Sequence, residues 1–401
     1  MPQHFAFVNV PASGHINPTI PLVEELVARG HRVSYATGAD RLQQVRAAGA
    51  EPVELPTEMP QHPPGSGFEF TPERMAQMQE HFLNDARASL PVLLEHYRGD
   101  RPDAVCHGTA AFTGAMLAEL LEVPEVALVP HFAGNEQFSL WQDLMPDDFD
   151  AEHPDLLAQR AKMRDFASEY GVTSEPRPMG GAPAPLNLVF LPEQFQLHPE
   201  TFDDRFAFLG PSLGSRGSET YRPAEPDKPL LFISLGTLFN DRPEFYRACF
   251  EAFGGSGWQV AMSVSDRVDS RALGTPPANF DVRASFPQPA VLAEASVFLS
   301  HTGMNSTMES LHAGVPLVAV PQMPEQEANA RRAEELGLAR RLDTAEALPS
   351  PEQLRAAVDE VAADERMRAR AAEMSAVVRA CGGARAGADA LEKHLGKKHL
   401  G

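Results

Sequence analysis

The sequence has few cysteines and lacks both long apolar runs and clustered positive charge, and each shortage excludes a class of protein. Its 401 residues include three cysteines, Cys106, Cys249 and Cys381, whose spacing suits neither a metal site nor a disulfide framework. We expect them to be packing residues in a reducing compartment. No stretch approaches the roughly 20 apolar residues that cross a bilayer. The N-terminus shows no signal peptide pattern, so the expected location is the cytoplasm.

The charge of the chain also limits its partners. The formal net charge is -21, and no run of Lys and Arg could follow a phosphate backbone, which argues against nucleic acid. The acidic surface repels anions, so an anionic ligand must be held by local devices such as helix N-termini. We therefore expect small-molecule partners, no membrane partner, and either a monomer or a homodimer.

The order of apolar and polar segments predicts an α/β fold with two domains. A strand at 5–10, a helix from near Pro18 and a strand at 32–37 form one strand–helix–strand unit, which is typical of a parallel sheet wrapped by helices. The same alternation restarts at Leu230, after a stretch rich in Gly, Pro and charge. The sequence therefore suggests an N-terminal domain at 1–210, a linker at 211–228, a second domain at 229–380 and a C-terminal helical tail at 381–401. The tail is expected to pack back toward the N-terminal domain, and 57–74 and 144–186 to form acceptor-side loops and short helices.

The most informative run covers 298–309, where an apolar strand leads into a glycine turn that opens a helix from near Asn305. Ligands of open α/β sheets bind at this edge, and free N–H groups at a helix start favour a diphosphate. His301 and the hydroxyls of Ser306 and Thr307 add donors. Glu309 lies one turn deeper, where a carboxylate can accept two ribose hydroxyls. The alternative is that Asn305 is a plain N-cap and Glu309 a surface residue.

This run resembles the nucleotide-sugar box of family 1 glycosyltransferases. With the motifs at 14–18, 234–237, 287–288 and 320–326, nearly the whole chain resembles the bacterial macrolide glycosyltransferase branch. The resemblance implies a GT-B fold, in which two Rossmann-like, doubly wound domains face each other across a cleft. It also implies an inverting, metal-independent UDP-glycosyltransferase. Such an enzyme moves a hexose, here glucose from UDP-glucose, to a hydroxyl of a lipophilic small molecule such as a macrolide, polyketide or flavonoid-like compound.

The resemblance also assigns roles on the donor side. It implies that His301, Asn305 and Ser306 hold the diphosphate with Thr237, that Glu309 takes the ribose, and that Glu325 and Gln326 read the sugar hydroxyls. The family has an aromatic residue two positions before Pro287, where this chain has Ser285, so Phe286 is the candidate to stack on the base. This leaves uridine or thymidine open, and helix capping is the alternative for Glu325 and Gln326. The complete predicted donor site is Thr237, Ser285, Phe286, Gln288, His301, Gly303, Met304, Asn305, Ser306, Thr307, Glu309, Glu325 and Gln326.

The predicted catalytic residue is His15, in the turn after the first strand. Inverting transfer needs a base near neutrality to take the acceptor proton, and histidine suits this. The resemblance implies the role, whereas a lone histidine would more often be a turn residue bonded to local backbone. The family orients this histidine with an aspartate, but Gly108 stands where we align it. Thr109, a water or an acceptor-side carboxylate are the possible substitutes, and an acidic acceptor such as a phenol would need less help.

Other functions have weaker support in the sequence. Asp148 and Asp150 form a D-x-D pattern, but the acidic loop around it follows no strand, so we expect no metal and no other cofactor. The first turn, 11–17, lacks the G-x-G-x-x-G of a nicotinamide dehydrogenase. A UDP-sugar epimerase, or a non-catalytic partner protein that keeps the donor pocket, is the runner-up.

Overall fold

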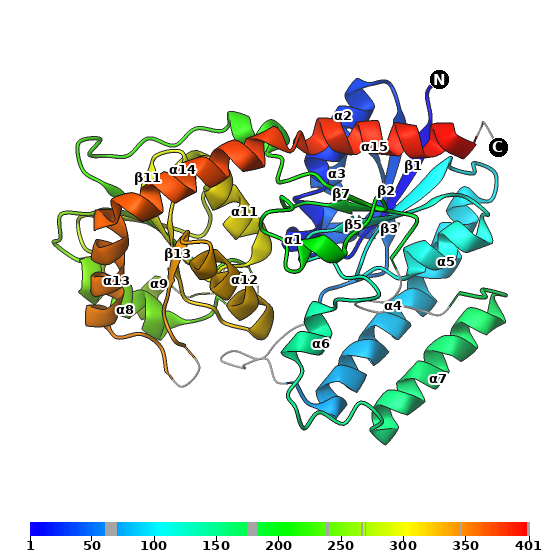
Figure 1. Ribbon diagram of the computed structural model, residues 1–401, viewed down its shortest axis with the longest axis horizontal. Coiled ribbons are helices and arrows are strands. Elements are labelled where there is room, and N and C mark those ends of the chain that lie inside the picture. Colours follow the sequence, from blue (N-terminus) through cyan, green and yellow to red (C-terminus); the bar gives the residue numbers. More distant parts are fainter. Residues whose placement is uncertain are drawn as a thin grey trace. The chain divides into compact units, whose positions relative to one another are not determined.

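The computed structural model describes residues 1–60, 70–174, 183–237, 240–265, 268, 270–344 and 347–398 (Figure 1). Within these residues the chain forms two compact units. Unit 1 holds the residues up to Ser212 and those from Cys381 on, and unit 2 holds Leu213–Ala380. Parts of the predicted acceptor-side loops, residues 61–69 and 175–182, lie outside the described residues.

Unit 1 is built on a seven-stranded parallel sheet of order β3-β2-β1-β4-β5-β6-β7. The strands predicted at 5–10 and 32–37 correspond to β1 and β2. The strands are β1 (His4–Val8), β2 (Arg32–Gly38), β3 (Glu51–Leu55), β4 (Ala104–Gly108), β5 (Glu125–Val129), β6 (Leu186–Val189) and β7 (Phe206–Phe208). The helices are α1 (Ser13–Ile16), α2 (Ile20–Ala28), α3 (Leu42–Ala47), α4 (Pro72–Tyr97), α5 (Thr113–Leu120), α6 (Leu140–Leu144), α7 (Pro154–Glu169) and α15 (Gly383–Lys398).

The helix α7 corrects the prediction of loops and short helices for 144–186. It has 16 residues and packs along α4 (Figure 1). Met163 and Phe166 are buried with Leu83 and Leu90 of α4 in one apolar cluster. The partner helix α4 begins at Pro72, inside the predicted loop 57–74, so the sequence pattern of these two ranges gave little sign that two long helices bury each other.

The last helix, α15, closes the core of unit 1. Figure 1 shows it in red beside α2 in blue, although hundreds of residues separate them in the sequence. Leu391 and Leu395 are buried in the same cluster as Leu22 of α2. Arg29 at the end of α2 donates to Glu392 of α15 at 3.1 Å and also pairs with Asp389.

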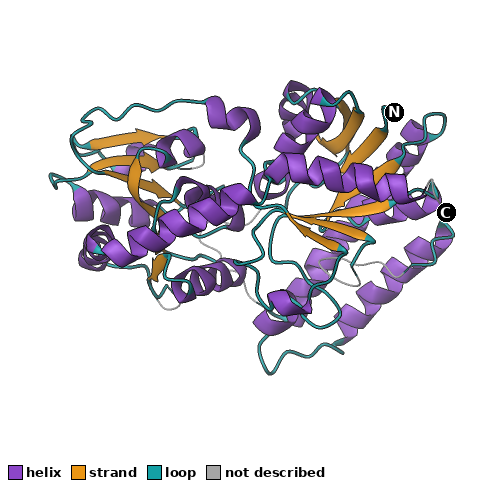
Figure 2. Cartoon of the chain, turned by 45° about the horizontal axis from the view of Figure 1, so that its top comes forward, coloured by secondary structure: helices purple, strands orange, loops and turns teal. Residues whose placement is uncertain are grey.

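Unit 2 is built on a six-stranded parallel sheet of order β10-β9-β8-β11-β12-β13, shown in orange among purple helices in Figure 2. The strands are β8 (Leu230–Ser234), β9 (Gln259–Ser263), β10 (Phe280–Arg283), β11 (Ala295–Ser300), β12 (Leu317–Ala319) and β13 (Ala339–Arg341). The helices are α8 (Pro243–Phe253), α9 (Ser270–Leu273), α10 (Gln288–Leu292), α11 (Met304–Ala313), α12 (Pro324–Glu335), α13 (Pro351–Ala363) and α14 (Glu365–Ala380). The two parallel sheets with helices around them confirm the predicted α/β class.

Short 3-10 turns complete both units. They are η1 (Ala39–Arg41) and η2 (Pro199–Thr201) in unit 1 and η3 (Gly214–Ser218) in unit 2. The division between the units falls after Ser212, and η3 lies inside the range 211–228 that the sequence suggested as a linker. Among the described residues, no helix has the length and apolar character needed to cross a membrane.

Candidate functional site

The turn between β11 and α11 is held in a strained shape by hydrogen bonds. Thr302 has a φ of 59°, a left-handed conformation that a β-branched residue rarely adopts. Its hydroxyl lies 2.7 Å from the carbonyl of His301 and 3.0 Å from that of Gln326. Asn329 of α12 donates to the carbonyl of Thr302 at 2.9 Å. Such strain persists where the surroundings over-determine it, so this turn is a fixed element.

The imidazole of His301 lies between two glycines. A Cβ added to Gly236 would lie 2.4 Å from His301 Nε2, and one added to Gly303 would lie 2.5 Å from it. Only glycine leaves room for the ring at these two positions, and Gly236 also has a φ of 75°. Burial lowers the pKa of His301 to about 4, so the ring is neutral at pH 7 and offers one N–H donor rather than a charge.

The N-terminus of α11 has the features of an anion site. Gly303 is the N-cap, and no side chain in the described part of the chain caps the first N–H groups of this helix. These donors and the helix dipole favour a negative ligand. Asn305 lies inside the first turn, so its alternative reading as a plain N-cap is wrong. Thr307 is fully buried and its hydroxyl has no partner among the described residues, so it offers no accessible donor here.

Glu309 is buried rather than on the surface, which overturns its alternative reading. The residue is 3% exposed, and its carboxylate accepts from three side chains. Arg216 Nη1 donates at 2.7 Å, Gln288 Nε2 at 2.8 Å and Asn305 Nδ2 at 3.2 Å. Arg216, which lies in η3, was not among the residues predicted for the site. The range 211–228 is therefore not a free connection, because its arginine pairs with a buried carboxylate of unit 2.

The remaining diphosphate candidates lie around the same turn. Ser306 Oγ accepts from Gln288 Nε2 at 3.1 Å, which joins α11 to α10. Met304 is buried at the start of α11, and Thr237 is exposed beyond the end of β8. The structure thus brings Gln288, Asn305, Ser306 and Glu309 into one hydrogen-bonded group.

The residues predicted to bind the base and the sugar differ in their exposure and in their contacts. Phe286 is half-buried, with the guanidinium of Arg283 4.8 Å from its ring centroid and Tyr221 at its edge, while Ser285 is exposed. Glu325 and Gln326 occupy the first turn of α12. Gln326 Oε1 accepts from the backbone N–H of Gln322 at 2.8 Å, one residue before the N-cap Met323, and no described side chain caps this helix as the alternative of helix capping required.

Comparison with known proteins identifies the family. The chain is 40% identical to the NDP-glycosyltransferase YjiC of Bacillus subtilis (strain 168), with 98% of each chain covered. The chain belongs to the family 1 glycosyltransferases. The family model described as "UDP-glucoronosyl and UDP-glucosyl transferase" matches residues 213–380 of this glycosyltransferase. The oleandomycin glycosyltransferase of Streptomyces antibioticus is 34% identical, over 99% of this chain and 92% of its own.

Solved structures show the same fold for the glycosyltransferase. The calicheamicin glycosyltransferase CalG4 superposes with a TM-score of 0.85 at 34% identity, with 98% of each chain covered. The glycotransferase of kitacinnamycin superposes with a TM-score of 0.84 at 32% identity, again with 98% of each chain covered. The fold is therefore the GT-B type with two Rossmann-like domains, as the resemblance implied.

In unit 1 of the glycosyltransferase, the catalytic candidate His15 lies on the four-residue helix α1. Asn9 Nδ2 donates to its backbone carbonyl at 3.0 Å, whereas His15 Nδ1 is buried without a partner among the described residues. The ring is thus not tied to the turn through this atom. Burial, and after it the charge of nearby His131, lowers the pKa of His15 to about 3. The imidazole is neutral and weakly basic.

The structure gives a reason for the glycine at 108. A Cβ there would lie 2.1 Å from Asn9 Oδ1, so the carboxamide of Asn9 fills the space of a larger side chain. Thr109, one of the suggested partners of His15, lies 2.8 Å from His131 Nε2 instead. His131 Nδ1 donates to the carbonyl of Phe132, which leaves Nε2 to accept the Thr109 hydroxyl. His131 had no signal in the sequence.

Thr109 and His131 line a pocket in unit 1. It encloses about 870 Å³ of empty space, its open mouth included. Most of its wall is apolar, and the polar pair His107 Nε2 and Glu125 Oε1 meets at 3.0 Å in the lining. Its lining includes Phe112, Phe132, Phe138, Trp141 and Phe206 with His107, Thr109, Glu125, His131, Asn135 and Asn187.

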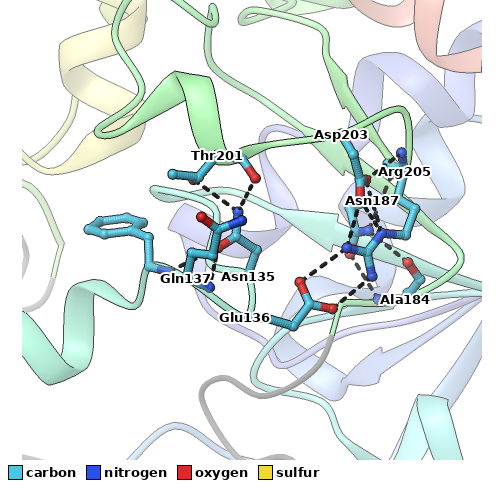
Figure 3. A network of polar contacts seen from close by, with 9 residues as sticks. Asn135, Glu136, Gln137, Ala184, Asn187, Thr201, Asp203 and Arg205 are labelled. Atoms are coloured by element: carbon cyan, nitrogen blue, oxygen red, sulfur yellow. Dashed lines mark hydrogen bonds and ion pairs between the residues drawn. The ribbon is translucent and has the colours of Figure 1, made fainter.

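Hydrogen bonds hold the wall of this pocket in place, as Figure 3 shows. Asn135 accepts from the N–H of Gln137 at 2.8 Å and donates to the carbonyl of Thr201 at 2.9 Å. Asn187 of β6 donates to the carbonyl of Ala184 at 2.8 Å. The loop after β5 is therefore a preorganised wall. Of the two loop ranges expected on the acceptor side, 144–186 contributes Pro183 and Ala184 to the lining, and the described part of 57–74 contributes no lining residue. The part of the chain that is described holds no cluster of metal-ligating side chains around Asp148 or elsewhere.

Proposed function

We propose that this glycosyltransferase moves a hexose, glucose from UDP-glucose, onto a hydroxyl of a lipophilic small molecule with inversion. The observation that carries the donor half is the uncapped N-terminus of α11 beside neutral His301 and the buried Glu309. The helix start offers N–H donors to a diphosphate, and the carboxylate can accept from a ribose. These groups stabilise the leaving diphosphate without a metal ion or another cofactor.

We propose His15 as the general base. The acceptor hydroxyl loses its proton to the neutral imidazole while its oxygen bonds to the anomeric carbon, and the bond to the diphosphate oxygen breaks. Burial lowers the pKa of His15 to about 3 and no carboxylate of the described residues raises it, so the base is weak. A weak base works best on an acidic hydroxyl, which favours phenols over aliphatic alcohols.

The pocket of unit 1 supports an acceptor of this kind. Its aromatic lining suits a large apolar or aromatic body, and its few polar side chains suit one or two oriented groups. Relatives whose names state an acceptor include the oleandomycin glycosyltransferase and the calicheamicin glycosyltransferase. We therefore place flavonoid-like phenols and phenolic polyketides first among the acceptors, and macrolides, whose hydroxyls are aliphatic, second.

An acceptor screen tests the proposal. The protein is mixed with UDP-glucose and, in matched pairs, phenolic and aliphatic alcohols of similar size, and products are read by intact mass. We expect a gain of one hexose, faster on the phenol of each pair, and unchanged by a metal chelator. Donor conversion without acceptor would point to the epimerase, and UDP binding without any product would point to a non-catalytic partner protein.

A further inference from the structure

The carboxylate of Glu309 has little capacity left for a ligand. A carboxylate has about four sites for hydrogen-bond donors. Arg216, Asn305 and Gln288 fill three of them, and the side chain of Glu309 is 2% exposed. Two ribose hydroxyls would need two free sites. We propose that Arg216 restricts Glu309 to one ribose hydroxyl, so that the site takes nucleoside diphosphates that lack the other one. This inference rests on the proposed function, in which Glu309 faces the ribose.

The ion pair persists when the nucleotide binds, for two reasons. Separating Arg216 from Glu309 leaves a buried carboxylate without its counter-charge, which costs more than one neutral hydroxyl returns. The segment that carries Arg216 is also held in place, because η3 packs on α10 and Gln288 of α10 binds the same carboxylate. The side chain of Arg216 is 24% exposed, whereas that of Glu309 is 2% exposed.

The consequence concerns the class of donor. Uridine and thymidine diphosphate sugars differ in the ribose 2′-hydroxyl and in a base methyl group. A carboxylate that binds both hydroxyls penalises the 2′-deoxyribose, whereas one that binds the 3′-hydroxyl alone can accept either sugar. In this chain Arg216 sets that choice, through the number of hydroxyls that Glu309 receives.

Calorimetric titration with UDP, 2′-deoxy-UDP and 3′-deoxy-UDP tests the inference. For the unchanged protein we expect one analogue to bind within about threefold of UDP and the other to bind about tenfold more weakly, the scale of one hydrogen bond to a charged group. In Arg216→Met, which frees a site on Glu309, both analogues should bind about tenfold more weakly than UDP. Arg222→Met, an exposed arginine in the same segment, is the control and should keep the original pattern.

Each outcome decides a separate question. Both analogues about tenfold weaker in the unchanged protein would overturn the inference, because Glu309 would then receive both hydroxyls. No binding of UDP, or no difference among the three nucleotides, would instead count against the proposed role of Glu309. If Arg216→Met does not fold, Gln288→Leu removes another donor from the same carboxylate and should give the same change. An unchanged pattern in Gln288→Leu would contradict the hydroxyl limit.

Discussion

His15 of unit 1 and His301 of unit 2 have the same chemistry but very different supports. Burial makes both imidazoles neutral, and both follow a parallel strand. His301 is confined by Gly236 and Gly303 beside a turn that several hydrogen bonds fix. His15 lies on a four-residue helix and leaves a buried nitrogen without a partner. The difference indicates that the turn beside His301 is rigid, whereas the ring of His15 has few constraints, which suits the anion-binding and proton-accepting roles proposed for them.

The largest expected effect separates catalysis from binding. His15→Ala should lower kcat about 10²- to 10⁴-fold, because the positioned base is lost. UDP affinity should stay within twofold, since the donor groups lie in unit 2. Steady-state rates and calorimetry measure the two properties. Glu309→Gln is the matched variant and should weaken UDP binding. Equal losses of kcat and of UDP affinity in both variants would show that the two residues do not have separate roles.

The next effect tests how tightly His301 is confined. Gly236→Ala introduces a Cβ that would contact the ring and forces a side chain into a left-handed conformation. We expect UDP affinity to fall about 10- to 100-fold, the range of a disturbed charge-assisted hydrogen bond. Calorimetry measures the change. Gly14→Ala is a suitable control because a Cβ there meets nothing within 4 Å, and a similar loss in that variant would show that general damage is responsible.

A stability effect tests the packing beside His15. Gly108→Ala places a methyl group against Asn9 Oδ1 and should lower the free energy of unfolding by about 1–3 kcal/mol. The melting temperature should drop by several degrees. Asn9→Ala combined with Gly108→Ala should recover part of the loss, because the clashing carboxamide is gone. If the double variant is less stable than the sum of the single changes, Asn9 does not fill the space at 108.

The smallest expected change is a flat pH profile. A base with an unshifted pKa near 6.5 would be half protonated there, and the rate would fall about tenfold by pH 5.5. Burial lowers the pKa of His15 to about 3, so the neutral form persists well below that range. We expect kcat/KM to change less than twofold between pH 7 and pH 5, measured with a non-ionising acceptor. A fall centred near 6.5 would show that His15 is supported by an unseen charge.

Local sequence signals predicted the turn between β11 and α11 of unit 2 better than the pocket of unit 1. The strand, glycine turn and helix at 298–309 could be predicted because adjacent residues determine turns and helix starts. The ion pair of Arg216 and Glu309 could not be predicted, because 93 positions separate the two residues and no local sequence pattern links them. The residues chosen for the donor site remain predictions in their roles.

The pocket of unit 1 depends on contacts that no short motif encodes. Phe138 and Trp141 read as ordinary apolar residues, yet both line a pocket whose wall is fixed by Asn135 and Asn187. The absence of the usual aspartate at 108 was visible in the sequence. Only the folded structure shows that Asn9 fills the space beside Gly108 and that Thr109 bonds to His131.

The return of α15 to unit 1 has a consequence for synthesis on the ribosome. Leu391 and Leu395 complete a core whose other members, such as Leu22, are translated near the start of the chain. All of Leu213–Ala380 is made in between. At about 5–20 residues per second, unit 1 waits roughly 10–30 s after Ser212 for its last helix. Nascent unit 1 therefore exposes apolar surface during this interval, and a C-terminal truncation would make that exposure permanent.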